Sequence, residues 1–311
     1  MKSLSTHLDE YLKFRRQLGF KLCVEGILLH NFVRYAVEKR AAFITTKLVL
    51  RWVTELPVIR TSLRAKRLTA LRQFARYVSG LDTRTEVPPR GLLPDRSRRP
   101  TPCLYRDEQV VELVELARRV ESRKGLKGAT LSTLFGLLAV TGMRVGEAIG
   151  LDREDVDLNQ CLLSIHRSKG NKTRLVPLHA STQRALQQYQ NLRDRVCPHP
   201  STPSFFIFEG GTRLFHCTVN RWFLRLSRQI GLRGATDRQG LRLHGLRHRF
   251  AIETLLNWYR SNANVEVHLP ELSTYLGHVN IGNTYWYLSA TPELLQLATD
   301  RLPQMRGEYY A

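Results

Sequence analysis

The sequence has no segment that would span a membrane and no cysteine pattern typical of a metal or redox site. Its longest apolar run, residues 134–140, is far shorter than the roughly 20 residues that a transmembrane helix needs. The five cysteines are scattered and form no Cys-x-x-Cys pair, which argues against a zinc ribbon or a thioredoxin-like motif. The N-terminus lacks the apolar stretch and cleavage site of a secretory signal. We therefore expect a cytoplasmic protein with reduced thiols, no metal or other cofactor, and no membrane association.

Acidic residues are scarce relative to basic ones. The chain has 27 Asp and Glu against 48 Lys and Arg, which leaves a formal net charge of +21. Such a surplus attracts DNA, RNA or an anionic membrane. Because no membrane segment is present, the charge favours a nucleic-acid partner.

Apolar periodicity is missing between residues 83 and 102, where the sequence has five prolines and several arginines. Proline fixes the backbone and removes a hydrogen-bond donor, so this composition is typical of an extended connection. It predicts a linker at residues 86–103. The linker would separate an N-terminal domain, residues 1–85, from a larger C-terminal domain, residues 104–311.

The N-terminal domain is predicted to be all-helical, because its apolar residues recur near the 3.6-residue period. One predicted helix, residues 61–79, has an apolar face and a basic face. A solvated helix face usually mixes charges of both signs, whereas residues 1–103 carry 21 basic groups and only 8 acidic ones. We therefore interpret the basic face as DNA-binding rather than merely solvated. Its members are Arg60, Arg64, Lys66, Arg67, Arg72 and Arg76.

The C-terminal domain is predicted to be mainly helical with a small antiparallel β-sheet. Residues 161–166 alternate like a strand, residues 175–178 form its expected partner, and Gly170 and Asn171 are turn residues between them. Helices are predicted at residues 106–121, 131–140, 182–195 and 219–230.

Two arginines occur in distinctive settings, Arg144 in Thr-Gly-Met-Arg-Val-Gly-Glu and Arg247 in His-Gly-Leu-Arg-His. A planar guanidinium can donate two hydrogen bonds to the non-bridging oxygens of a pentacovalent phosphorane, which lysine cannot copy. We interpret both arginines as groups that stabilise such a transition state. Glu147 either orients Arg144 from one helical turn away or serves as a helix cap or an ordinary ion pair.

Histidines and tyrosines near the C-terminus could supply proton transfer and a nucleophile. His244 precedes Arg247 by three residues, and His278 precedes Tyr287 by nine. A phenol with a pKa of about 10 needs a base and nearby positive charge before it can attack phosphorus. We predict Tyr287 as the nucleophile and Tyr285 as its rival. On a helix the two side chains point about 200° apart, so only one can face the site.

The histidines have distinct expected roles, because imidazole exchanges protons near neutral pH. His244 is expected to take the tyrosine proton or to hold the phosphate. His278 is expected to hydrogen-bond a non-bridging oxygen in the transition state. His248 is expected to be a buried structural residue.

In this order the residues resemble the tyrosine recombinase (phage integrase) family over roughly residues 104–287. The resemblance implies a site-specific DNA recombinase that forms a covalent 3′-phosphotyrosyl link without a metal. It also implies an N-terminal helical core-binding domain with a SAM-like fold that clamps DNA. Such enzymes bind double-stranded DNA with paired half-sites and work as homotetramers, some with an accessory protein or a partner recombinase.

Residues 165–174 look like the β-hairpin with which the family brings a lysine to the leaving 5′ oxygen. The matching residue is Lys169, just before the turn glycine, which would be the general acid. Lys172 is its rival and is more readily interpreted as a phosphate-backbone contact. Arg174 is also expected to bind DNA.

The sequence leaves two regions and three alternative functions open. Residues 257–264 form a stretch longer than the family usually has, and the tail, residues 288–311, could pack in cis or on a neighbouring protomer. A type IB topoisomerase shares the chemistry but relaxes supercoils as a monomer. A catalytically silent DNA-binding regulator would not need the whole set of six catalytic groups. A metal nuclease would want clustered carboxylates at the phosphate, which the sequence does not suggest.

Overall fold

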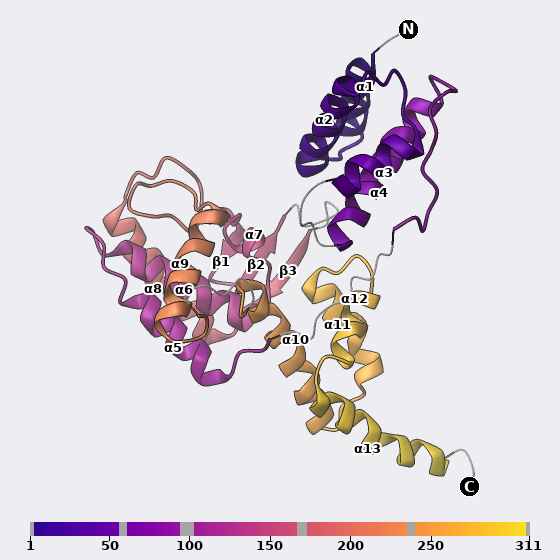
Figure 1. Cartoon of the computed structure of the whole chain (residues 1–311). Helices are drawn as coiled ribbons and strands as arrows, with labels where there is room; N and C mark the ends of the chain where they lie inside the picture. Colours follow the sequence, from indigo (N-terminus) through magenta and orange to yellow (C-terminus); the bar gives the residue numbers. More distant parts are fainter. Residues whose placement is uncertain (1–2, 56–60, 94–102, 167–172, 235–239, 309–311) are drawn as a thin grey trace. The chain divides into compact units, whose positions relative to one another are not determined.

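The computed structural model describes residues 3–55, 61–93, 103–166, 173–234 and 240–308, with the backbone alone at residues 61–62 and 302–308 (Figure 1). The chain divides into two compact units, Met1–Pro100 and Thr101–Ala311. The division falls inside the segment for which the proline-rich composition predicts a linker. Each unit has its own buried apolar core.

The described part of the N-terminal unit contains four helices. They are α1 (Leu4–Gln17), α2 (Cys23–Glu38), α3 (Thr46–Glu55) and α4 (Thr61–Ser79). Helix α1 begins where the Ser3 hydroxyl accepts a hydrogen bond from the backbone N–H of Thr6 at 3.2 Å, which satisfies a donor that has no partner within the helix. The apolar faces of the helices close on one core, in which the rings of Tyr11 and Phe74 lie 5.4 Å apart.

The described part of the C-terminal unit is mainly helical, with one small sheet. Its helices are α5 (Asp107–Arg118), α6 (Leu126–Thr141), α7 (Val145–Ala148), the 3₁₀ turn η1 (Arg153–Asp155), α8 (Ala180–Val196), α9 (His216–Gln229), α10 (Leu243–Arg260), α11 (Val265–Leu276), α12 (Gly282–Leu288) and α13 (Pro292–Glu308). The four helices that the sequence predicts in this unit before the second arginine motif are present, with ends shifted by a few residues.

The sheet has the antiparallel order β1-β2-β3, formed by Val156–Asp157, Leu162–Ile165 and Arg174–Pro177. Strands β2 and β3 are the predicted pair. Strand β1 was not predicted, because two residues are too short to show alternation. In β3 the alternation is clear: Val176 is buried against the core, whereas Leu175 is 59% exposed. Arg174 therefore lies on the inward face, two residues before Val176.

Helix α6 is buried over most of its surface and forms the centre of the C-terminal unit, with α5, α8 and α10 packed on it. The helix ends at Gly142, whose backbone is left-handed with φ +59°. A Cβ at this position would lie 2.5 Å from the Phe250 ring of α10. Glycine is required here both by the backbone conformation and by this close approach.

The longer stretch at residues 257–264 extends α10 and turns the chain into α11. The Asn264 side chain accepts hydrogen bonds from the first backbone N–H groups of α11, at 3.1 and 3.3 Å. Arg301 of α13 donates to carbonyls of this turn, including Ala263 O at 2.9 Å and Tyr259 O at 2.8 Å. Together with the fully buried Leu294, these contacts pack the first turns of the tail helix in cis on α10.

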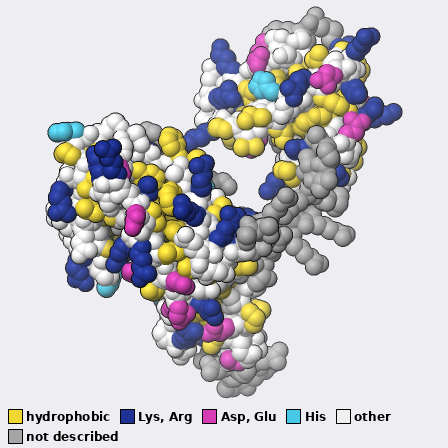
Figure 2. Space-filling view, turned by 60° about the vertical axis from the view of Figure 1, so that its left-hand side comes forward, with side chains coloured by type: hydrophobic (Ala, Val, Ile, Leu, Met, Phe, Trp, Pro, Cys, Tyr) yellow, Lys and Arg dark blue, Asp and Glu magenta, His cyan; other side chains and the backbone are white. Residues whose placement is uncertain are grey.

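The surface carries the charge surplus of the sequence. Figure 2 shows Lys and Arg side chains spread over the visible face of both units. None of the described helices is both long and apolar enough to cross a membrane.

Candidate active site

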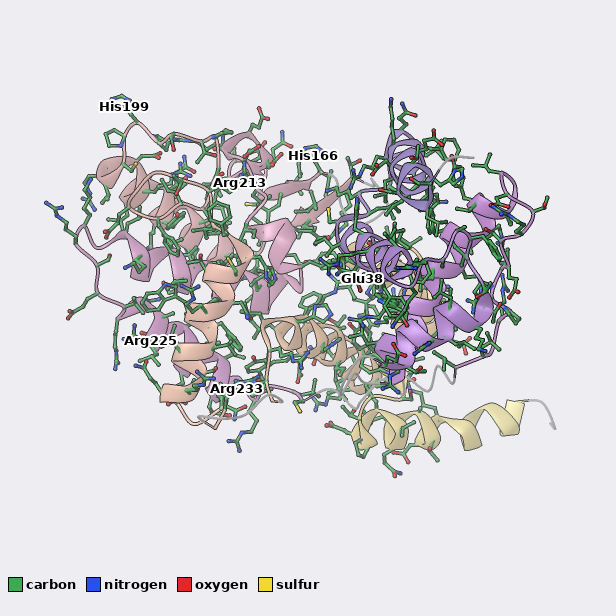
Figure 3. The ribbon with its side chains drawn as sticks, turned by 45° about the horizontal axis from the view of Figure 1, so that its top comes forward. Glu38, His166, His199, Arg213, Arg225 and Arg233 are labelled. Atoms are coloured by element: carbon green, nitrogen blue, oxygen red, sulfur yellow. The ribbon has the colours of Figure 1, made fainter. Side chains whose placement is uncertain are left out.

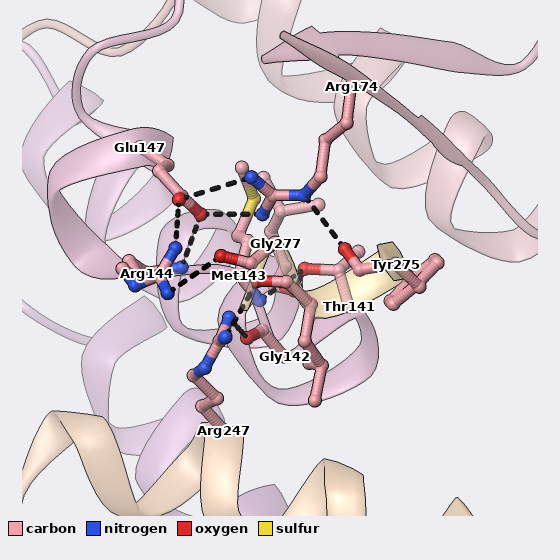
Figure 4. A network of polar contacts seen from close by, with 11 residues as sticks. Thr141, Gly142, Met143, Arg144, Glu147, Arg174, Arg247, Tyr275 and Gly277 are labelled. Atoms are coloured by element: carbon pink, nitrogen blue, oxygen red, sulfur yellow. Dashed lines mark hydrogen bonds and ion pairs between the residues drawn. The ribbon is translucent and has the colours of Figure 1, made fainter. Parts of the chain in front are cut away.

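Arg144 stands at the N-terminus of the short helix α7, just after the left-handed turn at Gly142 (Figure 4). Its guanidinium donates to the Glu147 carboxylate at 2.7 Å and to the backbone carbonyl of Gly277 at 3.1 Å. The side chain keeps 27% of its surface exposed. Arg144 is thus held by two groups that come from distant parts of the sequence, and it still has an open edge for a ligand.

Glu147 serves both roles that the sequence left open. Its carboxylate accepts the backbone N–H of Arg144 at 2.9 Å, which satisfies the start of α7, and it also pairs with the Arg144 guanidinium. Burial alone would raise the pKa of the Glu147 carboxyl, but hydrogen bonds from Arg174 and Arg144 hold it below its usual range. Glu147 is therefore a fixed negative group behind Arg144.

Arg174 was expected to contact DNA, but the structure places its side chain inside the site. The side chain is 9% exposed, and its guanidinium donates to both Glu147 oxygens, at 2.7 and 3.2 Å. Its Nε donates to the carbonyl of Tyr275 at 2.8 Å. In this arrangement Arg174 is a neighbour of Arg144 rather than a surface contact.

Arg247 lies on α10 and is 2% exposed. It donates to the carbonyl of Gly142 at 2.9 Å and to that of Leu276 at 2.7 Å. Burial, followed by the charge of Arg144, lowers the pKa of Arg247 to about 10, so the group stays charged at neutral pH. Arg144 and Arg247 therefore place two positive charges in one site.

The two histidines that frame the site have lowered pKa values. His244 is exposed at the surface, but partial desolvation of its ring, then the charges of Arg247 and Arg144, lower its pKa. The same causes lower the pKa of His278 to about 4, and its Nδ1 is 2.7 Å from the Thr284 hydroxyl. Both imidazoles are neutral near pH 7, a state that can donate one hydrogen bond and accept another.

Tyr287 lies on α12 and is 2% exposed, whereas Tyr285 is 52% exposed. The Tyr287 hydroxyl is 3.0 Å from Nδ1 of His248, and its ring stacks on that of His278 with centroids 6.3 Å apart. This geometry places Tyr287, not Tyr285, inside the site.

His248 was expected to be a buried structural residue, but it is half-buried and touches the oxygen of the expected nucleophile. It lies one turn after His244 on α10, and the two rings are in edge contact with centroids 4.6 Å apart. The i, i+4 spacing was the available signal, because it places both imidazoles on one helix face.

Lys169 and Lys172 lie outside the described residues, between strands β2 and β3. The strands that flank them are paired, with Ile165 opposite Arg174. Beside the hairpin, a groove of about 870 Å³ is lined in part by Arg144, His166 and Arg213, of which the last two are labelled in Figure 3.

The basic residues of α4 differ in their surroundings. Lys66 and Arg76 are exposed, and Arg64 and Arg67 are half-buried. Arg72 donates to the carbonyls of Pro88 and Pro89, at 2.7 and 2.9 Å, so it fixes the chain that follows α4. Arg60 lies outside the described residues.

Among the residues that the structure describes, no cluster of three or more His, Cys, Asp or Glu side chains is arranged to hold a metal ion. His199, labelled in Figure 3, is exposed at the surface.

The sequence profile described as the phage integrase family matches residues 105–293 of this chain. The chain is 42% identical over 306 residues to the putative integrase/recombinase y4rB of Sinorhizobium fredii, covering 97% of this chain and 98% of that protein. It is 31% identical over 292 residues to the tyrosine recombinase XerC of Herpetosiphon aurantiacus, covering 91% and 81% of the two chains.

Solved structures share the fold. A XerH site-specific recombinase bound to palindromic difH substrate gives a TM-score of 0.68 at 20% identity, covering 97% of this chain and 85% of that one. The Tn1549 transposon integrase in complex with transposon right end DNA also gives 0.68, at 14% identity, covering 97% and 100%. By its sequence profile and its relatives, the chain belongs to the phage integrase family, the tyrosine recombinases.

Proposed function

We propose that this protein is a site-specific DNA recombinase that cleaves and rejoins strands through a covalent 3′-phosphotyrosyl link, without a metal ion. One observation carries the proposal. The carbonyls of Leu276 and Gly277 hold Arg247 and Arg144 directly beside His278, whose ring stacks on that of Tyr287. Phosphate-binding groups and a nucleophile thus meet at the end of α11.

The chemistry follows from these groups. The Tyr287 oxygen attacks the scissile phosphorus, the bond from phosphorus to the 5′ oxygen breaks, and the phenol proton passes to a neighbouring imidazole. Arg144 and Arg247 stabilise the charge that grows on the non-bridging oxygens, and neutral His278 donates to one of them. Lys169 would give a proton to the leaving 5′ oxygen. Attack of a 5′ hydroxyl on the phosphotyrosyl phosphorus reverses these steps and releases Tyr287. Rejoining therefore requires no outside energy source.

Tyr287 is almost fully buried. A phosphodiester has to approach the phenol oxygen closely. We therefore expect residues that pack on Tyr287 to shift when DNA binds. Burial would keep the Tyr287 hydroxyl from reacting with other groups until DNA is bound, and a neutral imidazole could then accept its proton.

DNA binding would use both units. The N-terminal unit would be a SAM-like core-binding domain that clamps the duplex with exposed residues of α4 such as Lys66 and Arg76. Solved members of the fold include DNA complexes, such as the XerH and Tn1549 structures above. We infer a homotetramer on double-stranded DNA with paired half-sites, located with DNA in the cytoplasm and open to an accessory protein or a partner recombinase.

The proposal is tested on DNA that flanks the protein's own gene. Nicked duplexes from this DNA should trap a covalent protein–DNA complex in EDTA, and intact duplexes should give recombinant products and a tetrameric complex. Monomeric relaxation of supercoils without strand exchange would favour a topoisomerase. Binding without any covalent complex would favour a silent regulator, and loss of activity in EDTA would contradict the metal-free mechanism.

A further inference from the structure

Three consecutive backbone carbonyls at the C-terminal end of α11 each accept a hydrogen bond from a different arginine (Figure 4). The pairs, donor first, are Arg174 Nε to Tyr275 O at 2.8 Å, Arg247 Nη2 to Leu276 O at 2.7 Å and Arg144 Nη2 to Gly277 O at 3.1 Å. The last carbonyls of a helix have no partner within it and carry partial negative charge, so cations stabilise this end. His278 follows directly, so the arginines fix the point from which it projects.

Arg174 also holds the carboxylate that orients Arg144. Its two terminal nitrogens bind both oxygens of Glu147, and each of these oxygens also accepts a hydrogen bond from Arg144. The Glu147 side chain is only 6% exposed. Without Arg174 this buried carboxylate would lose half of its cationic partners and its bidentate support.

Gly277 is matched to the Arg174 guanidinium. Its backbone is left-handed with φ +66°, and a Cβ would lie 2.8 Å from Nη1 and 3.0 Å from Cζ of Arg174. A side chain at residue 277 would be strained by the left-handed backbone and would have to displace the Arg174 guanidinium. The alternation of β3 completes the arrangement, because it turns Arg174 inward together with the buried Val176.

We propose that Arg174 is a positioning residue for DNA cleavage: it sets the direction of the Arg144 guanidinium through Glu147 and the place of His278 through the end of α11. This inference rests on the recombinase function proposed above. It assigns Arg174 no contact with DNA, in contrast to the role expected from its position next to the hairpin.

Two other roles make different predictions. A DNA contact would weaken binding on removal and would lower the salt dependence of binding by about one phosphate contact. If the ion pair only stabilises the fold, removing Arg174 would lower the melting temperature without changing the rate at which bound, folded protein cleaves DNA. If Arg174 is a positioning residue, removing it would slow cleavage at saturating DNA while the affinity for DNA stays the same.

The test compares wild type, Arg174→Gln, Arg174→Lys, Glu147→Gln and the Arg174→Gln/Glu147→Gln double variant on a nicked duplex that traps the covalent complex. Arg228→Gln is the matched control, since it removes one exposed positive charge from α9. For each variant we would measure the DNA affinity at several salt concentrations, the single-turnover rate of covalent complex formation at saturating DNA, and the melting temperature.

We expect Arg174→Gln to form the covalent complex on the order of 100-fold more slowly, the scale of loss that a misplaced catalytic group causes. Its affinity for DNA and the salt dependence of that affinity should match those of wild type and of the control Arg228→Gln. Arg174→Lys should recover part of the rate, because lysine keeps the charge but not the fork that binds Glu147. The Arg174→Gln/Glu147→Gln double variant should be no slower than the slower single variant, since the two residues act together.

Several results would overturn the inference. One is a weaker affinity with a smaller salt dependence and a normal rate at saturation, which marks a DNA contact. Another is an unchanged rate in folded Arg174→Gln. If that variant does not fold, an unchanged rate in Arg174→Lys overturns it instead. A wild type that forms no covalent complex overturns the proposed function as well, so the two failures are distinguishable.

Discussion

The Tyr287 hydroxyl lies 3.0 Å from Nδ1 of His248, one residue after the buried Arg247. The order of residues in the sequence pointed instead to His244 as the proton acceptor. The His244 and His248 rings are in edge contact, so the phenol meets a pair of imidazoles rather than a single one.

We expect His248→Ala to form the covalent complex about 100-fold more slowly, because the phenol loses the group that holds it and can accept its proton. DNA affinity should stay as in wild type. His199→Ala, which removes an exposed histidine, is the control. An unchanged or faster rate in His248→Ala would mean that this contact plays no part in cleavage.

His278 should make the fold less stable in acid. Burial and the charges of Arg247 and Arg144 lower its pKa to about 4, whereas a histidine in the unfolded chain titrates near 6.5. Between about pH 6.5 and pH 4 the unfolded state therefore binds more protons, and lowering the pH destabilises the folded state. We expect the melting temperature to fall less between about pH 7 and about pH 5 in His278→Asn than in wild type. An equal fall in both would show that His278 does not contribute.

Gly142→Ala should destabilise the C-terminal unit by about 1–3 kcal/mol, because it adds a Cβ in a left-handed conformation and against the Phe250 ring. It should also slow cleavage, since the carbonyl of Gly142 holds Arg247. Gly136→Ala in α6 is the control: no atom outside its helix lies within 4 Å of its added Cβ, and alanine favours a helix by up to about 1 kcal/mol. Denaturant unfolding measures the free energy of unfolding of both variants. Equal values for Gly142→Ala and Gly136→Ala would contradict the prediction.

Two arginines of α4 should respond differently to substitution. Arg76 is exposed, so Arg76→Gln should weaken DNA binding and lower the slope of log affinity against log salt by about one. Arg72 is held by the carbonyls of Pro88 and Pro89, so Arg72→Gln should lower the melting temperature and leave the slope unchanged. The reverse outcome would mean that Arg72 leaves these carbonyls to reach DNA.

Local patterns in the sequence predicted much of this structure. The periods of 3.6 and 2 placed the helices and strands β2 and β3. The two arginine motifs and the spacing from His278 to Tyr287 selected residues that the structure places around the end of α11.

Contacts between distant residues could not be predicted in the same way. Arg144 and Gly277 form a hydrogen bond although they are 133 positions apart in the sequence. No local pattern indicates which carbonyl an arginine will contact. Arg174 was expected to bind DNA because of its position at the end of the hairpin, although the alternation with Val176 indicated an inward side chain. Strand β1 has only two residues, so the pairing with β2 defines it rather than its own sequence.

The most direct measurement traps the covalent complex on nicked DNA in EDTA, digests the protein and identifies the peptide linked to the DNA by mass spectrometry. Tyr287→Phe and Tyr285→Phe are measured in parallel, since both remove one hydroxyl from the same helix. We predict a link at Tyr287, its complete loss in Tyr287→Phe with DNA binding retained, and a normal yield in Tyr285→Phe. A covalent complex that persists in Tyr287→Phe, or a link found on any other residue, would contradict the account.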